Sequence, residues 1–292
     1  MVSACVLGGM NVDITGTPQT ALRLGDSNPG RVRMAAGGVG RNMAENLARM
    51  GFRVELMAPL GGDGFAAFLQ GACEEAGVGL RHAPRLPLPS SVYLCLMDGR
   101  GDMHAAVNDM ALCEAVTPDM LDMDALNAFD GALLDANLPA PVLARVAQEA
   151  RVPLIADPVS AAKAQRLLPL LPRLAAIKPN RLEAQALTGE ADPAQAARAL
   201  CRLGVGRAFV SAGPLGMFYC GEGAEGRLPP PPVPVANATG AGDSATAAIA
   251  AGCLLGWRVE QTARLACRVA ALTLQSPFAV SPALQADVLE TL

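Results

Sequence analysis

The sequence is poor in several residue types from which functional sites are built. Aromatic side chains make up 3% of its 292 residues, and histidine occurs only at positions 82 and 104. Two histidines exclude a metal site assembled from several of them. Eight cysteines are present, but none forms a Cys-x-x-Cys pair, and most stand inside apolar runs such as "SACVLGG". We interpret them as buried, reduced thiols.

A surplus of positive charge and long apolar segments are also missing. The net charge is −4, so nothing in the balance of charges points to a nucleic acid or an anionic membrane as partner. The longest apolar stretch, around "ATAAIAAGCLLGW", is too short to span a membrane, and the N-terminus lacks the basic start of a signal peptide. We therefore predict a cytoplasmic protein whose partners are small molecules.

What the sequence does contain is a regular alternation of strand and helix patterns. Apolar runs such as "FDGALLDANL", "VPLIADPVS" and "RAFVSAGPLG" alternate with helical segments such as "APVLARVAQEA" and "ADPAQAARALCRLG". This order is typical of an α/β protein with a mostly parallel sheet that helices cover on both faces. We expect one domain over residues 1–292, because no internal repeat or second globular region is visible.

Two amphipathic segments, at about residues 15–36 and 90–109, interrupt this alternation. The first, "ALRLGDSNPGRVRMA", indicates two exposed strands around an Asp-Ser-Asn-Pro-Gly turn. The second, "SSVYLCLMDGRGDMHAAVND", indicates another hairpin with Asp98 and Gly99 in its turn. We expect both to form a small β lid over the active edge of the main sheet.

The predicted buried strands end in polar residues. In parallel sheets, ligands bind where the carboxyl ends of the strands meet. The polar residues at these ends are Asn11 and Asp13, Asp135 and Asn137, Asp157, Lys178 and Asn180, and Ser211. The sequence therefore predicts a binding site at that edge.

The stretch "NATGAGDSATAA" combines a glycine loop, one carboxylate and a run of helix formers. It lacks the Lys-Ser/Thr ending of a Walker phosphate loop. Its small residues let the backbone approach a ligand, and the helix after them presents unpaired N–H groups, so Gly240, Ala241 and Gly242 can form an anion hole. Asp243 is then either an N-cap or a base that accepts the proton of a hydroxyl group.

Two further motifs leave alternatives open. In "GGVGRN" the glycine spacing differs from Gly-x-Gly-x-x-Gly, which argues against a nicotinamide-dependent dehydrogenase. Asn42 at its end either binds sugar hydroxyls or caps a helix. In "KPNRLEA", Asn180 and Glu183 lie three residues apart at a helix start, where they either cap the helix or organise magnesium and phosphate through water.

These motifs together resemble those of a known family. "GGVGRNMAENLARMG", the Asn-x-x-Glu of "NRLE", "SAGPLG" and "ATGAGDS" occur in the order seen in the ribokinase-like (PfkB) carbohydrate kinases, and the match runs from about residue 3 to 280. The resemblance implies a ribokinase-like three-layer sandwich with a central, mostly parallel sheet of about eight strands and a small β lid. It also implies phosphorylation of a hydroxymethyl group on a sugar or nucleoside by ATP.

The resemblance implies roles for individual residues. Asp243 corresponds to the catalytic base, and the amides of Gly240, Ala241 and Gly242 to the anion hole. Asn180 and Glu183 correspond to the residues that organise Mg²⁺ and ATP, with Glu183 reaching the metal through water. The residues implied along the nucleotide are Ser211, Gly213 and Gly216. Those implied at the sugar hydroxyls are Asp13, Gly38 and Asn42, with Asn11 close by.

Within that family, "DSNPGRV", "VNDM", "DPVSAAK" and "KPNRLEA" look like segments of bacterial pseudouridine kinases, which form pseudouridine 5′-phosphate and ADP. A C-linked uracil presents two ring N–H donors and two carbonyl acceptors, which lid side chains would have to match. The candidates are Asp26, Ser27, Asn28, Asn108 and Asp109. For the first three, ordinary turn formation is the alternative. A kinase for another nucleoside or pentose, and a catalytically silent sugar-binding regulator, also remain open.

Two expectations concern cations and assembly. Relatives commonly carry Asp-Thr at the start of the second glycine signature, where this chain has Asn237 and Ala238. The carboxylate that supports a monovalent-cation site is therefore missing, and potassium activation is doubtful. The exposed lid strands offer a surface for a homodimer, because their edges and apolar faces need cover.

Overall fold

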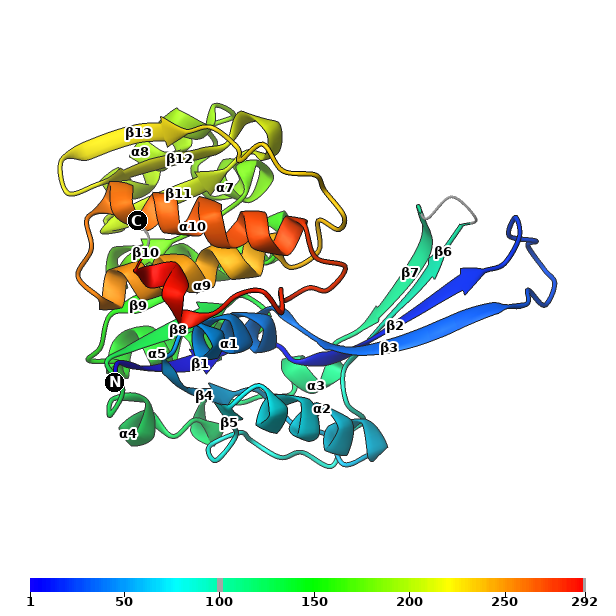
Figure 1. Cartoon of the computed structure of the whole chain (residues 1–292). Helices are drawn as coiled ribbons and strands as arrows, with labels where there is room; N and C mark the ends of the chain where they lie inside the picture. Colours follow the sequence, from blue (N-terminus) through cyan, green and yellow to red (C-terminus); the bar gives the residue numbers. More distant parts are fainter. Residues whose placement is uncertain (99–101, 291–292) are drawn as a thin grey trace.

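The structure is a computed structural model that describes residues 1–98 and 102–290. The expected turn at Gly99 lies outside the described residues. Two sheets organise the chain, a large one within the body and a smaller one that projects from it (Figure 1).

The large sheet has nine described strands in the order β13-β12-β11-β10-β9-β8-β1-β4-β5. All neighbours are parallel except the antiparallel pairs β11–β12 and β12–β13. The interior strands β1, β8 and β9 are buried along their whole length, which explains their continuous apolar runs. The strands are β1 (Ser3–Leu7), β4 (Arg53–Met57), β5 (Val78–Gly79), β8 (Gly131–Asp135), β9 (Leu154–Asp157), β10 (Leu174–Ile177), β11 (Arg207–Ser211), β12 (Met217–Gly221) and β13 (Ala224–Leu228).

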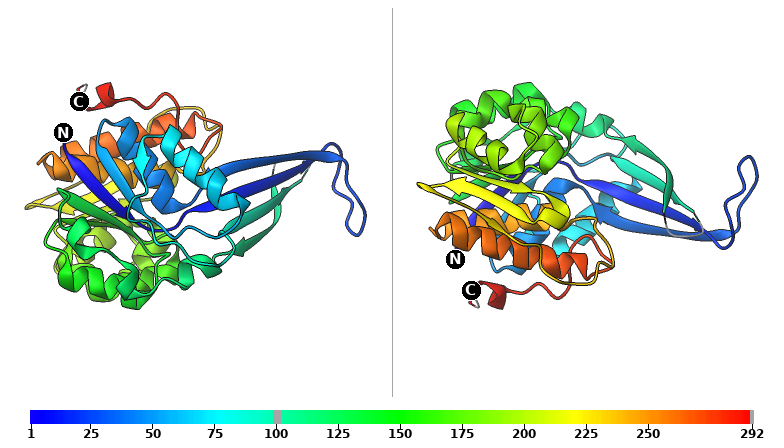
Figure 2. Two further views of the ribbon diagram at one scale, coloured as in Figure 1. Left: turned by 90° about the horizontal axis from the view of Figure 1, so that it is seen from below. Right: turned by 90° about the horizontal axis from the view of Figure 1, so that it is seen from above.

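Helices cover both faces of this sheet, so the predicted three-layer α/β sandwich is confirmed (Figure 2). One face carries α1 (Val39–Arg49), α2 (Gly64–Glu75), α9 (Ala241–Leu254) and α10 (Val259–Leu274). The other carries α4 (Met123–Leu126), α5 (Ala140–Glu149), α6 (Ala161–Ala164), α7 (Arg181–Thr188) and α8 (Pro193–Arg202). Short connecting helices are α3 (Ala111–Glu114) and the 3-10 helices η1 (Pro118–Met120), η2 (Gln165–Arg173), η3 (Gly213–Leu215) and η4 (Ala286–Leu289).

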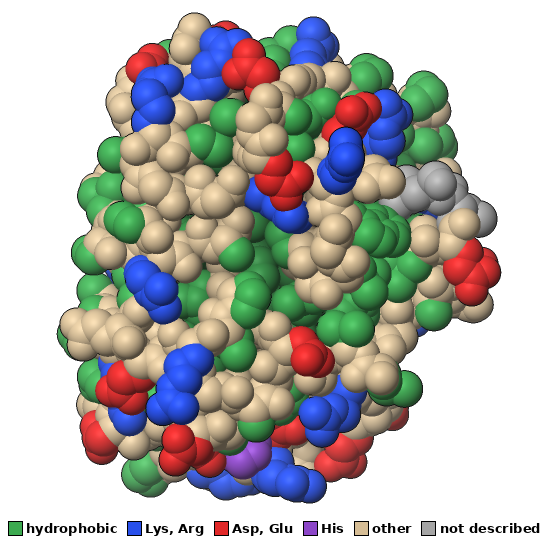
Figure 3. All heavy atoms as spheres, turned by 90° about the vertical axis from the view of Figure 1, so that its left-hand side faces the viewer, with side chains coloured by type: hydrophobic (Ala, Val, Ile, Leu, Met, Phe, Trp, Pro, Cys, Tyr) green, Lys and Arg blue, Asp and Glu red, His purple; other side chains and the backbone are tan. Residues whose placement is uncertain are grey.

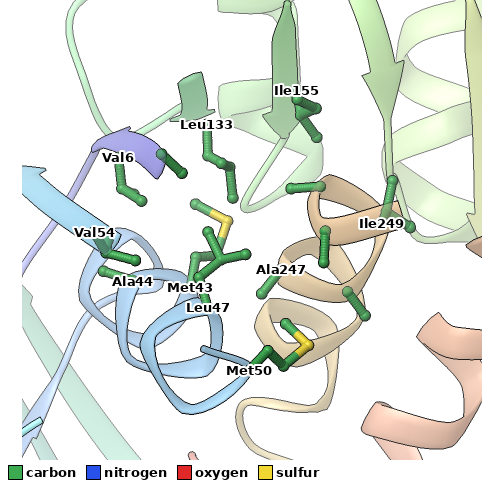
Figure 4. Packing of buried hydrophobic residues seen from close by; sticks show 14 of the residues in the cluster. Val6, Met43, Ala44, Leu47, Met50, Val54, Leu133, Ile155, Ala247 and Ile249 are labelled. Atoms are coloured by element: carbon green, nitrogen blue, oxygen red, sulfur yellow. The ribbon is translucent and has the colours of Figure 1, made fainter. Parts of the chain in front are cut away.

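The core between α1, α9 and the sheet fixes two helix starts beside each other. Met43 and Leu47 of α1 point into the space between Leu133 of the sheet and Ala247 of α9 (Figure 4). All four side chains are fully buried, and each large one stabilises the fold by about 1.5–3 kcal/mol. α9 is rich in alanine, and residues 244–252 are buried, so small side chains let this helix pack closely on all sides.

The smaller sheet has the strand order β3-β2-β6-β7 and is called the projecting sheet below. It consists of β2 (Asn11–Pro18), β3 (Gly30–Gly37), β6 (Val92–Met97) and β7 (Met103–Asp109). Its first strand begins four residues before the expected lid segment, so Asn11 and Asp13 belong to it. The expected strand at residues 21–25 is not formed. Pro18 ends β2, and residues 19–29 make a loop that Gln19 closes by donating its N–H to the Pro29 carbonyl at 3.0 Å.

The surface mixes both signs of charge. On the side of the body away from the projecting sheet, Lys and Arg side chains are interspersed with Asp and Glu (Figure 3). In the described parts of the chain, no helix combines the length and the hydropathy that a membrane span requires. All eight cysteines are free thiols, and Cys5, Cys73, Cys95 and Cys113 are buried.

Candidate active site

The polar residues predicted at the strand ends do lie along one edge of the large sheet. Asp135 and Asp157 are the last residues of the neighbouring strands β8 and β9, where they pair in register. Beyond β10, Asn180 forms an isolated parallel bridge with Ser211 at the end of β11. Strand β1 leads through residues 8–10 directly into β2, so the projecting sheet starts from the same edge (Figure 1).

The start of α9 brings a carboxylate to this edge. Gly240 adopts the left-handed region with φ 81°, and a Cβ atom there would collide with the Ala279 carbonyl, so the loop requires glycine. Gly240 occupies the N-cap position, and no side chain caps the helix. Asp243, in the first turn, accepts a hydrogen bond at Oδ2 from Asn42 Nδ2 at 2.8 Å. Asp243 is therefore not the N-cap.

The start of α1 supplies that partner. Gly38 has φ 98°, and a Cβ atom would lie 2.6 Å from the Gly9 carbonyl oxygen, so only glycine allows this approach to the end of β1. Gly38 is the N-cap and no side chain caps α1, so the capping alternative for Asn42 does not hold. Asn42 instead joins Asp243, 201 residues away in the chain.

Arg41 connects this pair to Asp13, and sequence reasoning missed it. Its Nη1 donates to Asn42 Oδ1 at 3.2 Å, and its guanidinium forms a buried ion pair with Glu45. Burial raises the pKa of Asp13, while a hydrogen bond from Asn11 Nδ2 to Oδ1 at 2.6 Å and the charge of Arg41 lower it. Hydrogen bonds thus link Arg41 to Asn42 and Asn42 to Asp243, and the charge of Arg41 acts on Asp13; these four residues are called the polar wall. The only sequence signal was the arginine beside Asn42.

The surroundings of Asp243 shift its acidity toward neutrality. Its pKa is raised to about 7, first because the carboxyl is desolvated and then because Asp157 adds negative charge nearby. The Asn42 hydrogen bond and the positive charge of Lys178 act in the opposite direction. A carboxylate with a pKa near neutral pH can accept a proton efficiently as a general base.

Asp157 and Lys178 form a buried ion pair next to Asp243. Lys178 Nζ lies 3.1 Å from Asp157 Oδ2, and both side chains are 5% exposed. In the sequence these residues stood out only as polar strand ends. Their pairing could not be read there, because it depends on β9 and β10 being neighbours in the sheet.

Asn180 and Glu183 form a capping box at the start of α7, so the capping alternative is realised here. Asn180 Oδ1 accepts from the Glu183 N–H at 3.0 Å, and Glu183 Oε2 accepts from the Asn180 N–H at 2.8 Å. Burial and the charge of Asp157 raise the pKa of Glu183, while Lys178 and the Asn180 N–H lower it.

The oxygen chemistry of this motif suits a magnesium ion that keeps its waters. Asn180 Nδ2 donates to Glu183 Oε1 at 2.6 Å, so each carboxylate oxygen has one described donor and further acceptor capacity toward water. Within the described residues, no group of three His, Cys, Asp or Glu side chains is placed to hold a metal. A bound Mg²⁺ would therefore take its remaining ligands from phosphate and water.

The residues implied along the nucleotide border the same edge. Ser211 ends β11, and its N–H donates to the Pro179 carbonyl at 3.0 Å. Gly213 starts the short helix η3, and Gly216 follows it with φ 86°. A Cβ atom on Gly216 would collide with the Leu228 carbonyl, so this glycine is explained by the turn into β12.

The register of the projecting sheet separates Asn108 from Asp109. Asp13 pairs with Tyr93, and Tyr93 pairs with Asn108, so these three side chains form a row on one face. Asp109 pairs with Val92 and belongs to the opposite face, where its Oδ1 accepts from the Ala111 N–H at 3.2 Å. The register therefore puts Asp109 on the face opposite Asn108, and the prediction that both residues face the ligand does not fit this arrangement, because the two side chains point to opposite faces.

Asp26, Ser27 and Asn28 lie in the loop at the far tip of the projecting sheet (Figure 1). Asn28 Nδ2 donates to the carbonyls of Arg23 and Asp26, each at 2.9 Å, and Asp26 Oδ1 accepts from the Ser27 N–H. These contacts are those of the turn-forming alternative. The structure does not bring the three residues together with Asp243.

Asn237 also has a local role. Its Oδ1 accepts from the Thr239 N–H at 2.9 Å, which shapes the loop before the predicted anion hole. The amide oxygen already has a donor, and the side chain carries no charge to attract a cation. The geometry adds no support for a potassium site.

Comparison with known proteins identifies the family. The pfkB carbohydrate kinase family profile matches residues 1–286. A pseudouridine kinase from Escherichia coli (strain K12) is 32% identical over 287 residues, which cover 95% of this chain and 92% of that protein. A solved carbohydrate kinase from Agrobacterium tumefaciens is 33% identical with a TM-score of 0.89, covering 99% of this chain and 96% of its own.

The fold is shared more widely. The ribokinase from Arabidopsis thaliana, solved as a complex with ribose and ATP, has a TM-score of 0.85 at 23% identity, covering 99% of this chain and 98% of its own. That likeness confirms the ribokinase-like fold. Together with the family match over nearly the whole chain, the motifs and fold lead to one conclusion. The chain belongs to the PfkB family of carbohydrate kinases.

Proposed function

We propose that this kinase transfers the γ-phosphoryl group of ATP to the 5′-hydroxyl of pseudouridine, forming pseudouridine 5′-phosphate and ADP. The observation that carries the proposal is the row of Asp13, Tyr93 and Asn108 across three strands of the projecting sheet. This row continues the polar wall that ends at Asp243. Similarity to the E. coli pseudouridine kinase along almost the whole chain supports the same substrate.

In this proposal the three residues of the row contact successive parts of the nucleoside, from the sugar to the base. Asp13 accepts sugar hydroxyls, and the Tyr93 ring offers an apolar surface to the uracil. Among the described residues, the Tyr93 hydroxyl donates to Met103 Sδ, a weak acceptor, at 3.4 Å. The Asn108 amide has both donors and an acceptor, which match the carbonyls and N–H groups of the base. Pseudouridine has a ring N–H that uridine lacks, so a site built around that group rejects uridine.

The transfer step requires one base and one anion site. The Asp243 carboxylate accepts the proton of the 5′-hydroxyl, whose oxygen forms a bond to the γ-phosphorus. The bond from that phosphorus to the β–γ bridging oxygen breaks, and its electron pair leaves with ADP. The amides of Gly240, Ala241 and Gly242 at the start of α9 hold the transferring group. Asn180 and Glu183 would hold a bound Mg²⁺ through water, and the ion would neutralise phosphate charge.

A substrate panel tests the proposal. ADP release with Mg²⁺ and ATP is measured for pseudouridine, uridine, guanosine and ribose, with and without potassium. We expect the kcat/KM for pseudouridine to exceed that for uridine and ribose by at least about 100-fold. Equal turnover of ribose would overturn the nucleoside assignment, and no turnover of any acceptor would favour a silent sugar-binding regulator. The Asp243→Asn variant, prepared identically, measures background from contaminating kinases.

We further infer that two copies of the chain associate through the projecting sheet. The face opposite the Asp13 row carries exposed apolar side chains, namely Val32, Met34, Leu94, Leu96 and Val107. An apolar sheet face of this kind is stabilised by burial. A second copy presents the same face, so the contact can close with twofold symmetry.

A further inference from the structure

Lys178 is an unusual residue in this chain. Only two of the 23 Lys and Arg residues are lysines, Lys163 and Lys178. Lys178 follows β10, at the edge where the nucleotide and acceptor are proposed to meet, and its side chain is 5% exposed. A buried ammonium group is costly unless it is paired, so its position calls for an explanation.

The Asp157 carboxylate holds the ammonium from a fixed position. Asp157 Oδ2 accepts from Lys178 Nζ at 3.1 Å and from Thr246 Oγ1 at 2.6 Å. Its Oδ1 accepts from the Val159 N–H at 2.8 Å. Residues from β9, α9 and the end of β10 therefore meet in one buried network, which leaves the ammonium little freedom to move.

The network aims the ammonium at the start of α9. A Cβ atom on Gly242 would lie 3.0 Å from Lys178 Nζ, so glycine at this position leaves the space that the ammonium reaches. Gly242 belongs to the first turn of α9, where the backbone N–H groups have no partner within the helix. An ammonium has three donors, and Asp157 is the partner described for one of them.

The surrounding charges keep Lys178 protonated. Burial lowers its pKa, but the carboxylates of Asp157, Glu183 and Asp243 outweigh burial, and the net pKa lies above its usual value. Asp243 is the proposed base, and Glu183 the proposed magnesium-organising residue. The ammonium thus stands among the groups that act on the transferring phosphoryl, in a setting where charge is weakly screened.

We propose that Lys178 is a catalytic residue whose ammonium donates hydrogen bonds to the transferring phosphoryl group. It takes the place of the lysine that a Walker phosphate loop has and that the Gly-Ala-Gly-Asp loop lacks. Asp157 and Thr246 are positioning residues that hold its ammonium at the anion hole. Negative charge on the equatorial oxygens of the phosphoryl group is stabilised by a cation already in place. This inference rests on phosphoryl transfer from ATP, and it is independent of pseudouridine being the acceptor.

The alternative is that Lys178 only balances the buried charge of Asp157. Three variants separate the two roles, namely Lys178→Met, the neutral pair Asp157→Asn with Lys178→Met, and Lys163→Met as the matched control. Lys163 donates to Asn137 Oδ1 at 2.6 Å and lies outside the network. We expect Lys178→Met to lower kcat by about 100- to 1,000-fold while KM for ATP changes less than about fivefold.

The neutral pair removes both buried charges, so it avoids the uncompensated carboxylate of the single variant. If Lys178 donates hydrogen bonds to the phosphoryl group, the double variant folds and binds ADP but stays as inactive as Lys178→Met. Restoration of kcat to within about tenfold of wild type would show a charge-balancing role and overturn the proposal. Lys163→Met is expected to keep kcat within about twofold of the wild-type value.

A measurement on the unaltered protein covers the case in which these variants do not fold. Lysine labelled with ¹³C at Cε places only two signals in the spectrum, which Lys163→Met assigns. With Mg²⁺, ADP and fluoroaluminate, a planar stand-in for the phosphoryl group, the Lys178 signal is expected to shift, and with Mg²⁺ and ADP alone to shift much less. Equal responses to both additions, or no response, would overturn the proposal. No acceptor is present, so the outcome does not depend on the substrate panel.

Discussion

At the scale of single residues, the chemistry of Asp243 depends on side chains from other elements. Asn42 of α1 donates a hydrogen bond to its carboxylate. The negative charge of Asp157, at the end of β9, raises the pKa of Asp243, and the positive charge of Lys178, after β10, lowers it. Burial is the largest influence, and the pKa settles at about 7. Only in this setting does the pKa of a lone aspartate in a glycine loop suit the proposed role of a base at neutral pH.

Replacing this carboxylate tests its role directly. Asp243→Asn keeps the size of the side chain but cannot accept a proton, so we expect kcat to fall by about 100- to 10,000-fold. ATP affinity, measured by calorimetry, is expected to change little. Asp124→Asn, an exposed carboxylate in α4, is the control and keeps full activity. Wild-type turnover by Asp243→Asn would remove the base role.

The pH dependence follows from the raised pKa of Asp243. In the proposed mechanism the deprotonated form acts as the base, so kcat/KM is expected to fall about tenfold per pH unit below about 7. The Asn42 amide lowers this pKa, so Asn42→Leu should move the acid limb to higher pH. A limb that stays in place or moves down contradicts this assignment, whereas a change in KM alone does not.

The raised pKa of Asp243 also affects stability. Its contribution to the free energy of unfolding is largest at low pH, whereas the proposed activity requires higher pH. The folded state binds the proton of Asp243 more tightly than the unfolded state, whose pKa is near 3.8. Asp243 therefore contributes most to the free energy of unfolding below pH 4. This contribution is lost as the pH rises toward about 7, so the pH that favours activity disfavours stability at this residue.

At the scale of secondary structure elements, strand β7 assigns neighbouring residues to different tasks. Asn108 shares a face with Tyr93 and Asp13, whereas Asp109 points to the other face and accepts from the Ala111 N–H. The alternation of side chains along a strand makes the difference. Because the two residues are neighbours in the sequence, one role was predicted for both. The register of β6 with β7 shows that their side chains point to opposite faces of the sheet.

These two residues form a matched pair for mutation. Asn108→Ala is expected to lower kcat/KM for pseudouridine by about 10- to 100-fold and to narrow the preference over uridine. Asp109→Asn keeps an acceptor for the Ala111 N–H and should change kcat/KM less than about threefold. The reverse order of effects would contradict the assignment of the binding face.

At the scale of the whole molecule, the projecting sheet has two unlike faces. One continues the polar wall toward Asp243, and the other is apolar and exposed, with Val32 at 73% and Val107 at 65% exposure. The apolar face is the surface through which we propose that two copies associate. Burying it would also stiffen the sheet that carries the proposed base-recognition row.

Sedimentation velocity at micromolar concentration tests this association. We expect the wild-type protein to be a dimer and Val107→Glu to be a monomer, because burying a carboxylate in an apolar contact is strongly unfavourable. Met120→Glu, at an exposed apolar position outside the projecting sheet, is the control and should stay dimeric. A monomeric wild-type protein, or identical behaviour of the two variants, would contradict the proposed interface.

Much of the architecture could be predicted because it follows from local patterns. Apolar runs became buried strands, and Gly51 ended α1 with φ 88° as its place after the helical pattern indicated. The first hairpin was less well predicted. Alternation around Asp-Ser-Asn-Pro-Gly suggested a tight turn, but Pro18 and the Asn28 contacts formed a longer loop and moved the strand to Asn11–Pro18.

By itself, the sequence determined the α/β class, the glycine loops that start α1 and α9, and the candidate base Asp243. Each depends on residues close together in the chain, where periodicity and backbone freedom act. Only the tertiary structure decided that Asn42 meets Asp243, that Arg41 links it toward Asp13, and that Lys178 is paired with Asp157 beside Gly242. Those contacts depend on which strands are neighbours and how helices cross them. The surroundings that set charge and acidity at the site therefore arise only when distant segments pack together.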